Sequence, residues 1–178
     1  MEIILAENHG FCYGVKRAVE MADEAANSEG RSYTLGPIIH NPQVVGRLES
    51  KGVSPIQEVA DIDEGTMIIR SHGVGPAIYA EAEEKGLHIL DATCPHVKKA
   101  QQDAKSVIED GMTLVILGEK NHPEVKSINL WANNKGIIIE DENSAEKLQI
   151  VEKMGVVVQT TFSQFKFNSI IEILEKKS

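Results

Sequence analysis

The chain has 178 residues, of which 25% are charged and 42% hydrophobic, and its formal net charge at pH 7 is −9. This length allows one large domain or two small ones with a sizeable core. The acidic balance offers no electrostatic footprint for nucleic acid or an anionic membrane, and aromatic residues, at 4%, are too few for a base-stacking platform. No apolar run approaches the ~20 residues of a membrane span. These properties are typical of an ordinary soluble globular protein.

One unit recurs along the chain: a short β-rich run, a polar loop and an amphipathic helix. The β-rich runs are expected at residues 1–6, 32–39, 65–70, 87–93, 112–118, 135–141 and 155–161. The helices are expected at about 15–26, 44–52, 77–85, 95–110 and 124–132, with a short helix after residue 144 and a last one through residue 174. Strands that alternate with helices at this spacing predict an α/β fold with parallel sheets and right-handed crossovers. The polar loops then lie at the carboxyl ends of strands, where open α/β folds bind ligands.

The only two cysteines each follow a β-rich run at the start of a helix: Cys12 in NHGFCYGVKRA and Cys94 in DATCPHVKKA. Free backbone N–H groups and the helix dipole at such a position favour the thiolate, the form that binds iron or zinc. Pro95 suits the first position of a helix and so predicts Cys94 at the N-cap. Gly10 and Gly14 allow the backbone around Cys12 to approach a bulky ligand. The alternative is two inert, buried cysteines.

A disulfide between the two cysteines is a further alternative, and the expected cellular compartment argues against it. Met1 is followed directly by Glu2 and an apolar run, without a basic segment or a long hydrophobic segment. We therefore expect no signal peptide and a cytoplasmic location. A structural disulfide is not expected in that compartment.

Three histidines occupy matching loops: His40 in IIHNP, His72 in RSHGVGP and His122 in KNHPEV. Each follows a β-rich run and precedes a predicted helix start. We expect them to converge on one crevice, where imidazole N–H groups and helix N-termini hold a phosphate or diphosphate. The competing interpretation is a zinc site built from these histidines and the cysteines, although the short ligand spacing of most structural zinc sites is lacking.

The remaining polar residues of these loops suggest supporting roles. Ser71, Thr160 and Thr161 would add neutral donors to an anion site. Glu124 is the only carboxylate within one of these histidine loops, and two interpretations of it are open. It is either a favourable acidic residue in the first turn of a helix or a proton donor beside the ligand.

Taken together, these motifs resemble those of the 4-hydroxy-3-methylbut-2-enyl diphosphate reductases, the LytB/IspH family. The resemblance runs from Met1 to the end of the chain. It rests on GFCYGVKRA, the HN pair after a strand, SHGV, DATCPHV, NHPEV and QTT, in this order and spacing. It implies an α/β protein of three similar units with pseudo-threefold symmetry around a [4Fe-4S] cluster, which three cysteines ligate.

Position by position, the resemblance implies that Cys12 and Cys94 are two of the cluster ligands. It implies that the three histidines contact the diphosphate, that Glu124 relays a proton, and that Thr160 positions water and substrate nearby. The implied reaction is the last step of the non-mevalonate isoprenoid pathway. It removes the allylic hydroxyl of the substrate reductively and yields isopentenyl and dimethylallyl diphosphates, with a ferredoxin or flavodoxin as electron donor.

The sequence departs from the family pattern in one respect. We expect an N-terminal strand and cysteine loop over residues 1–13, one α/β unit over 14–94 and a second over 95–178. The family's third unit, which bears the third cysteine, is not found. The chain is therefore expected to be the first two-thirds of an enzyme and inactive alone. The alternatives are a zinc-binding hydrolase and a diphosphate-binding module without chemistry.

Overall fold

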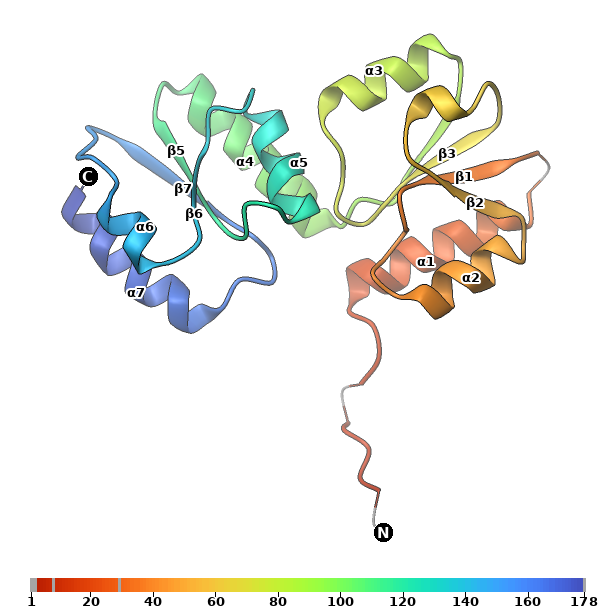
Figure 1. Cartoon of the computed structure of the whole chain (residues 1–178), viewed down its shortest axis with the longest axis horizontal. Helices are drawn as coiled ribbons and strands as arrows, with labels where there is room; N and C mark the ends of the chain where they lie inside the picture. Colours follow the sequence, from red (N-terminus) through yellow and green to blue (C-terminus); the bar gives the residue numbers. More distant parts are fainter. Residues whose placement is uncertain (1–2, 8, 29, 178) are drawn as a thin grey trace.

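The computed structural model describes residues 3–7, 9–28 and 30–177, and it contains two parallel β-sheets side by side (Figure 1). The first sheet has the order β2-β1-β3-β4 and the second the order β6-β5-β7, and every neighbouring pair is parallel. The predicted α/β fold with repeated parallel-sheet units is confirmed. The strands of the first sheet are β1 (Ser32–Leu35), β2 (Val53–Ile56), β3 (Thr66–Ile69) and β4 (His88–Asp91). Those of the second are β5 (Thr113–Leu117), β6 (Ile137–Ile139) and β7 (Met154–Val158).

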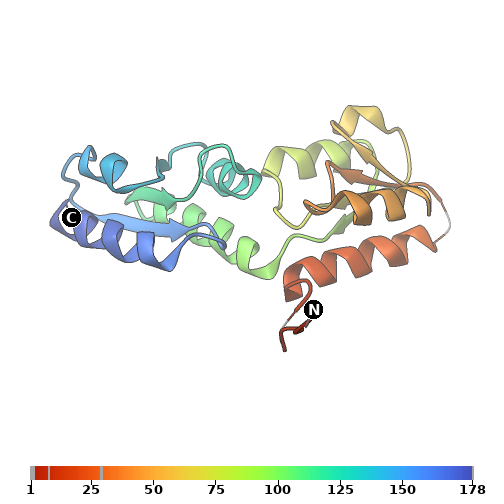
Figure 2. The ribbon, with the colours of Figure 1, turned by 60° about the horizontal axis from the view of Figure 1, so that its bottom comes forward.

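Helices cover both faces of each sheet (Figures 1 and 2). They are α1 (Tyr13–Ala26), α2 (Pro42–Glu49), α3 (Pro76–Glu84), α4 (Pro95–Glu109), α5 (Pro123–Trp131), α6 (Glu142–Glu146) and α7 (Gln164–Leu174), with 3-10 turns η1 (Val59–Asp61) and η2 (Glu175–Lys177). Proline occupies the start of α2, α3, α4 and α5, where its missing N–H costs nothing. Among the described residues, none of the helices combines the length and apolar character of a bilayer span.

Alternation along the central strands divides each unit's core into two layers. In β3, Ile68 packs under α1 and α2, whereas Met67 and Ile69 pack under α3 and η1. In β5, Leu114 and Ile116 face α4 and α5, whereas Val115 and Leu117 face α6 and α7. This is the period-two pattern of a sheet buried on both faces. The short strands therefore hold their C-terminal loops on rigid, fully packed supports.

One expectation about strands was wrong, and one strand was not predicted. Residues 3–6 of the predicted run 1–6 form no strand, and Met1 and Glu2 lie outside the described residues. Ile4 is 84% exposed, because no strand among the described residues pairs with this segment, which extends away from both sheets (Figure 1). The edge strand β2 was not predicted. Its Pro55 lacks an N–H, and an edge position tolerates that.

The loop after β3, residues 70–75, belongs to the first unit and makes hydrogen bonds to helices of the second. Ser127 of α5 donates a hydrogen bond to the His72 carbonyl oxygen over 3.0 Å and accepts one from the Gln101 side chain of α4 over 2.7 Å. Trp131 of α5 donates its indole N–H to the Val74 carbonyl oxygen over 2.9 Å. The second unit thus fixes a loop that the first unit supplies. The division of the chain at residues 94 and 95 stays a prediction.

Candidate functional site

The three histidines of the matching loops lie together, at the carboxyl ends of β1, β3 and β5. The ring centroids of His40 and His72 are 4.7 Å apart, those of His72 and His122 are 5.4 Å apart, and those of His40 and His122 are 6.2 Å apart. One ring nitrogen from each lies within 4.8 Å of the other two. The expected convergence of these three side chains is therefore present, and it draws on both sheets.

His72 is partly buried in this cluster. Burial, and then the positive charges of His40, Arg70 and His122, lower the pKa of its imidazole from 6.5 to about 4. His72 is therefore neutral near pH 7. Its Nδ1 is buried and has no hydrogen-bond partner among the described residues. A buried polar atom without a partner costs free energy, so a ligand that supplied one would be stabilised here.

His122 is oriented by its own helix. It is the N-cap residue of α5, and its Nδ1 accepts a hydrogen bond from the Glu124 backbone N–H over 3.2 Å. Because Nδ1 is the acceptor, the neutral ring carries its proton on Nε2. That N–H remains available as a donor toward an anion.

Glu124 is 2% exposed and is held by the loop after β7. One of its carboxylate oxygens accepts the backbone N–H of Thr160 over 2.6 Å, and the other accepts the Thr160 hydroxyl over 2.8 Å. The Thr160 residue itself is exposed. The arrangement connects a buried carboxyl group, through one hydroxyl, to the solvent side of the loops.

The two cysteines stand at the starts of two helices, one in each unit. Cys12 is the N-cap of α1 and Cys94 the N-cap of α4, as predicted for Cys94, and neither thiol caps its helix by a hydrogen bond. A Cβ placed on Gly14 would come within 2.5 Å of the Cys94 sulfur, so Cys94 packs directly on the first turn after Cys12. Arg17 of α1 donates hydrogen bonds to the carbonyl oxygens of Thr93, over 3.3 Å, and Asp91, over 3.4 Å. These bonds hold the start of α1 against the loop that carries Cys94.

The cysteine and histidine loops share a cavity and a hydrogen bond. The Cys94 backbone N–H donates to the Ser71 carbonyl oxygen over 2.9 Å, one residue before His72. Phe11, beside Cys12, lines a cavity of about 250 Å³ whose other wall carries His40 and His72. The cavity therefore extends from apolar side chains near the cysteines to the imidazoles.

The other predicted participants lie in different places. The Ser71 hydroxyl donates to the Ile38 carbonyl oxygen, and the Thr161 hydroxyl accepts from Gln159, so both are already engaged. The remaining histidines, His9, His88 and His96, are exposed and lie outside the cluster. Sequence reasoning missed Ser127, Gln101 and Arg70. Their signal is weak, because a serine or glutamine within a helix and an arginine at a strand end are common.

The low pKa of His72 predicts how stability depends on pH. Between about pH 6.5 and pH 4 the unfolded chain binds a proton at His72 that the folded chain does not. The free energy of unfolding should therefore fall as the pH is lowered through this window. His72→Gln should remove a slope of at most about 1.4 kcal/mol per pH unit. Urea unfolding at several pH values measures this. His88→Gln, at an exposed position, is the control, and equal slopes in both variants would contradict the assignment.

Comparisons with known proteins show the family of the chain. A family model described as LytB protein matches residues 3–178. A 4-hydroxy-3-methylbut-2-enyl diphosphate reductase from Geobacter metallireducens is 48% identical over 178 residues, which is 99% of this chain and 63% of that protein. The enzyme of the same name from Geotalea uraniireducens is 47% identical over 97% of this chain and 61% of its own length. The chain thus spans less than two thirds of the length of these curated relatives.

Solved structures lead to the same family. The E-1-hydroxy-2-methyl-but-2-enyl-4-diphosphate reductase of Plasmodium falciparum superimposes with a TM-score of 0.90 at 32% identity, over 96% of this chain and 55% of that one. A structure described as (E)-4-hydroxy-3-methyl-but-2-enyl diphosphate reductase, the terminal enzyme of the non-mevalonate pathway, gives a TM-score of 0.82 at 43% identity, over 97% of this chain and 63% of that one. On these matches, the chain belongs to the LytB protein family.

Proposed function

We propose that this chain supplies the diphosphate-binding residues and two cluster ligands of a 4-hydroxy-3-methylbut-2-enyl diphosphate reductase. The observation that carries the proposal is the meeting of His40, His72 and His122 beside the loops of Cys12 and Cys94. An anion site next to two free thiols at helix N-termini suits a phosphorylated substrate that is reduced at a metal cluster. The relatives' names support the same substrate and reaction class.

The histidines would bind the diphosphate through N–H groups. His122 has an Nε2 proton to donate, and His72 has an Nδ1 without a partner among the described residues. A bound anion raises the pKa of a neighbouring imidazole, so His72 would become easier to protonate when the diphosphate enters. The short carbon chain of the substrate would then occupy the cavity beside Phe11, toward the cysteines.

The residues present fit two corners of an iron–sulfur cluster. Cys12 and Cys94 each stand at a helix start, their sulfurs cap neither helix, and the missing Cβ of Gly14 lets the Cys94 sulfur approach the first turn after Cys12. These two thiolates would hold the cluster. When bound, a [4Fe-4S] cluster supplies electrons and a Lewis-acidic iron. The sequence contains only these two cysteines, so a third thiolate would have to come from outside these 178 residues.

Glu124 and Thr160 would transfer protons to the substrate. The overall reaction replaces an allylic C–OH by C–H and releases water, which consumes two electrons and two protons. Electrons would come from a ferredoxin or flavodoxin. A protonated Glu124 could pass its proton to the Thr160 hydroxyl oxygen, 2.8 Å away, as that hydroxyl gives its own proton to the departing oxygen.

The three imidazoles also favour a second candidate, a zinc site. Their nitrogens lie within 4.8 Å of one another, and would have to approach to about 3.3 Å to share a tetrahedral zinc ion. A three-histidine zinc site of this kind would serve a hydrolase rather than a reductase. Diphosphate binding by the metal-free protein would favour the anion site over the zinc site.

Binding of inorganic pyrophosphate to the histidine cluster tests the proposal. In chelator-treated buffer, the imidazole NMR signals of His40, His72 and His122 should shift together as pyrophosphate is added. Replacing any one of them with glutamine should weaken the affinity that the other two signals report by about tenfold, because each charged hydrogen bond contributes roughly 1.5 kcal/mol or more. His88→Gln should bind as the parent does. Binding that appears only after zinc is added would favour the zinc site instead.

The cysteines have a separate prediction. Anaerobic reconstitution of the chain with iron, sulfide and an added thiol should give a brown protein with broad visible absorbance. Cys12→Ser and Cys94→Ser should each lose most of it, since a hydroxyl is a poor cluster ligand. The chain alone should not sustain turnover, because two thiolates are fewer than the three that the resemblance implies. An unchanged chromophore in the double variant, or sustained turnover by the chain, would overturn this assignment.

A further inference from the structure

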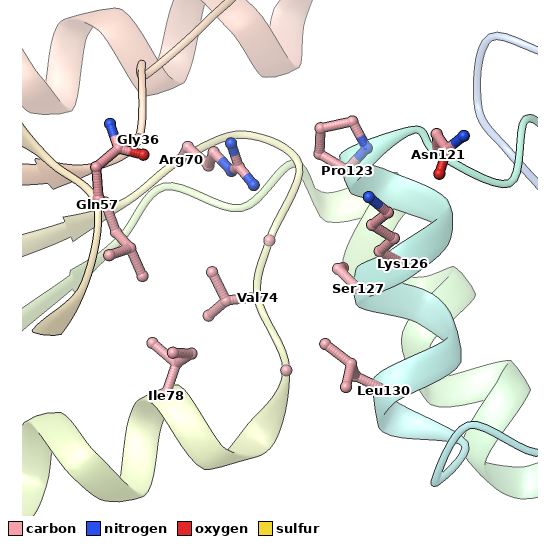
Figure 3. A pocket seen from close by; sticks show the side chains of 13 residues that line it. Gly36, Gln57, Arg70, Val74, Ile78, Asn121, Pro123, Lys126, Ser127 and Leu130 are labelled. Atoms are coloured by element: carbon pink, nitrogen blue, oxygen red, sulfur yellow. The ribbon is translucent and has the colours of Figure 1, made fainter.

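A second cavity lies on the other side of the loop that carries His72. Its volume is about 350 Å³, within the range of small-molecule sites. One wall comes from residues 70–75 and the first sheet, and the other from helix α5 and the loop before it (Figure 3). We propose that this cavity is a binding site for a small molecule with a phosphate or diphosphate head and a short apolar body. The proposal does not rest on the reductase function.

The charge of the cavity is positive in an acidic chain. Arg70 and Lys126 are its only ionisable lining residues, and none of the described residues that line it is a carboxylate. Neither cation takes part in an ion pair within the described ranges. In Figure 3 the two side chains come from opposite walls and lie at the same end of the cavity. Two unpaired cations that face one space are a site for an anion.

Arg70 is held there at a cost. Its Nε is buried without a hydrogen-bond partner in the described structure, and burial lowers the pKa of its guanidinium. A Cβ on Gly36 would lie 2.9 Å from one of its terminal nitrogens, so a larger residue would displace the guanidinium. A partly buried charge without a counterion is unfavourable. A bound phosphate would supply both the counterion and hydrogen-bond acceptors.

The opposite end of the cavity is apolar. Val74, Ile78 and Leu130 line it, away from the two cations (Figure 3). Gly75 brings the backbone close to Leu130, since a Cβ there would lie 2.8 Å from the leucine side chain. A charged head and a body of a few carbons would match the two ends of the cavity. A free inorganic anion would leave the apolar end unfilled.

This cavity is separate from the one at the histidines. Arg70, Gly73 and Val74 line it, whereas Ser71 and His72, from the same loop, line the 250 Å³ cavity, and the two cavities share no lining residue. The loop is therefore a partition with a cation on one face and an imidazole on the other. Because the charge of Arg70 acts on His72, a ligand in this cavity would also alter the histidine site.

Methyl NMR of the 178-residue chain tests the proposal. The probes are isopentenyl diphosphate, inorganic pyrophosphate and the matching uncharged alcohol, 3-methyl-3-buten-1-ol. The methyl signals of Val74, Ile78 and Leu130 should shift and saturate with isopentenyl diphosphate. Pyrophosphate should bind more weakly, and the alcohol should produce no saturable shift. The same methyl shifts should persist in His72→Gln, which separates this site from the diphosphate site of the proposed reductase.

Matched variants identify the head-group contacts. Arg70→Met and Lys126→Met should each weaken the binding reported by the methyl signals by about tenfold or more. Lys135→Met removes the same charge at an exposed position outside the cavity and should change nothing. If Arg70→Met does not fold, Lys126→Met decides, because Lys126 is exposed on its helix. Unshifted methyl signals, equal binding in Lys126→Met, equal binding of the alcohol, or loss of the shifts in His72→Gln would each overturn the proposal.

Discussion

The hydrogen bonds from helix α5 to the loop after β3 are the restraint on which the site depends. Ser127 and Trp131 hold the carbonyl oxygens of His72 and Val74, and the Cys94 backbone N–H holds the carbonyl oxygen of Ser71. A loop of the first unit is thereby fixed by side chains of the second and by the backbone of Cys94, at the boundary between them. Together with the packing of Gly75 on Leu130, this restraint sets the distance between His122 of the second unit and His40 of the first. The loop thereby fixes the position of the two sheets relative to each other.

The second feature is the concentration of positive charge and N–H groups in a chain with a net charge of −9. The bulk field repels an anionic ligand, so attraction must be local. The structure supplies it on both faces of one loop, with imidazoles on one side and Arg70 with Lys126 on the other. Burial keeps His72 neutral near pH 7. The cluster can therefore exist without severe repulsion before a ligand arrives.

Much of this arrangement follows from local rules that a sequence displays. Pro95 after Cys94 is sufficient to predict an N-cap, because proline favours the first helical position. The convergence of His40, His72 and His122 follows from parallel strands, whose carboxyl ends share an edge. Cys12 and Cys94 being neighbours is a tertiary fact, however. It depends on α1 packing against the segment before α4, and only the resemblance to the family implied it in advance.

The structural features that were not predicted depend on residues distant in the sequence. Strand β2 contains Pro55 and becomes a strand only because β1 offers an edge. Arg70 resembles any strand-end arginine until Gly36, from another loop, packs on its guanidinium. The exposed segment at residues 3–7 has an apolar strand pattern but no strand to pair with among those described. In each case the pattern gives a tendency, and the neighbour decides the outcome.

The central claim is that loops from both sheets form one anion site at the three histidines. A crystal structure of the chain grown with inorganic pyrophosphate tests it most directly. The account predicts diphosphate oxygens within hydrogen-bond distance of imidazole nitrogens of His40, His72 and His122, with the thiols of Cys12 and Cys94 on the same side of the molecule. Three imidazoles that lie apart, or a diphosphate bound only elsewhere, would contradict it.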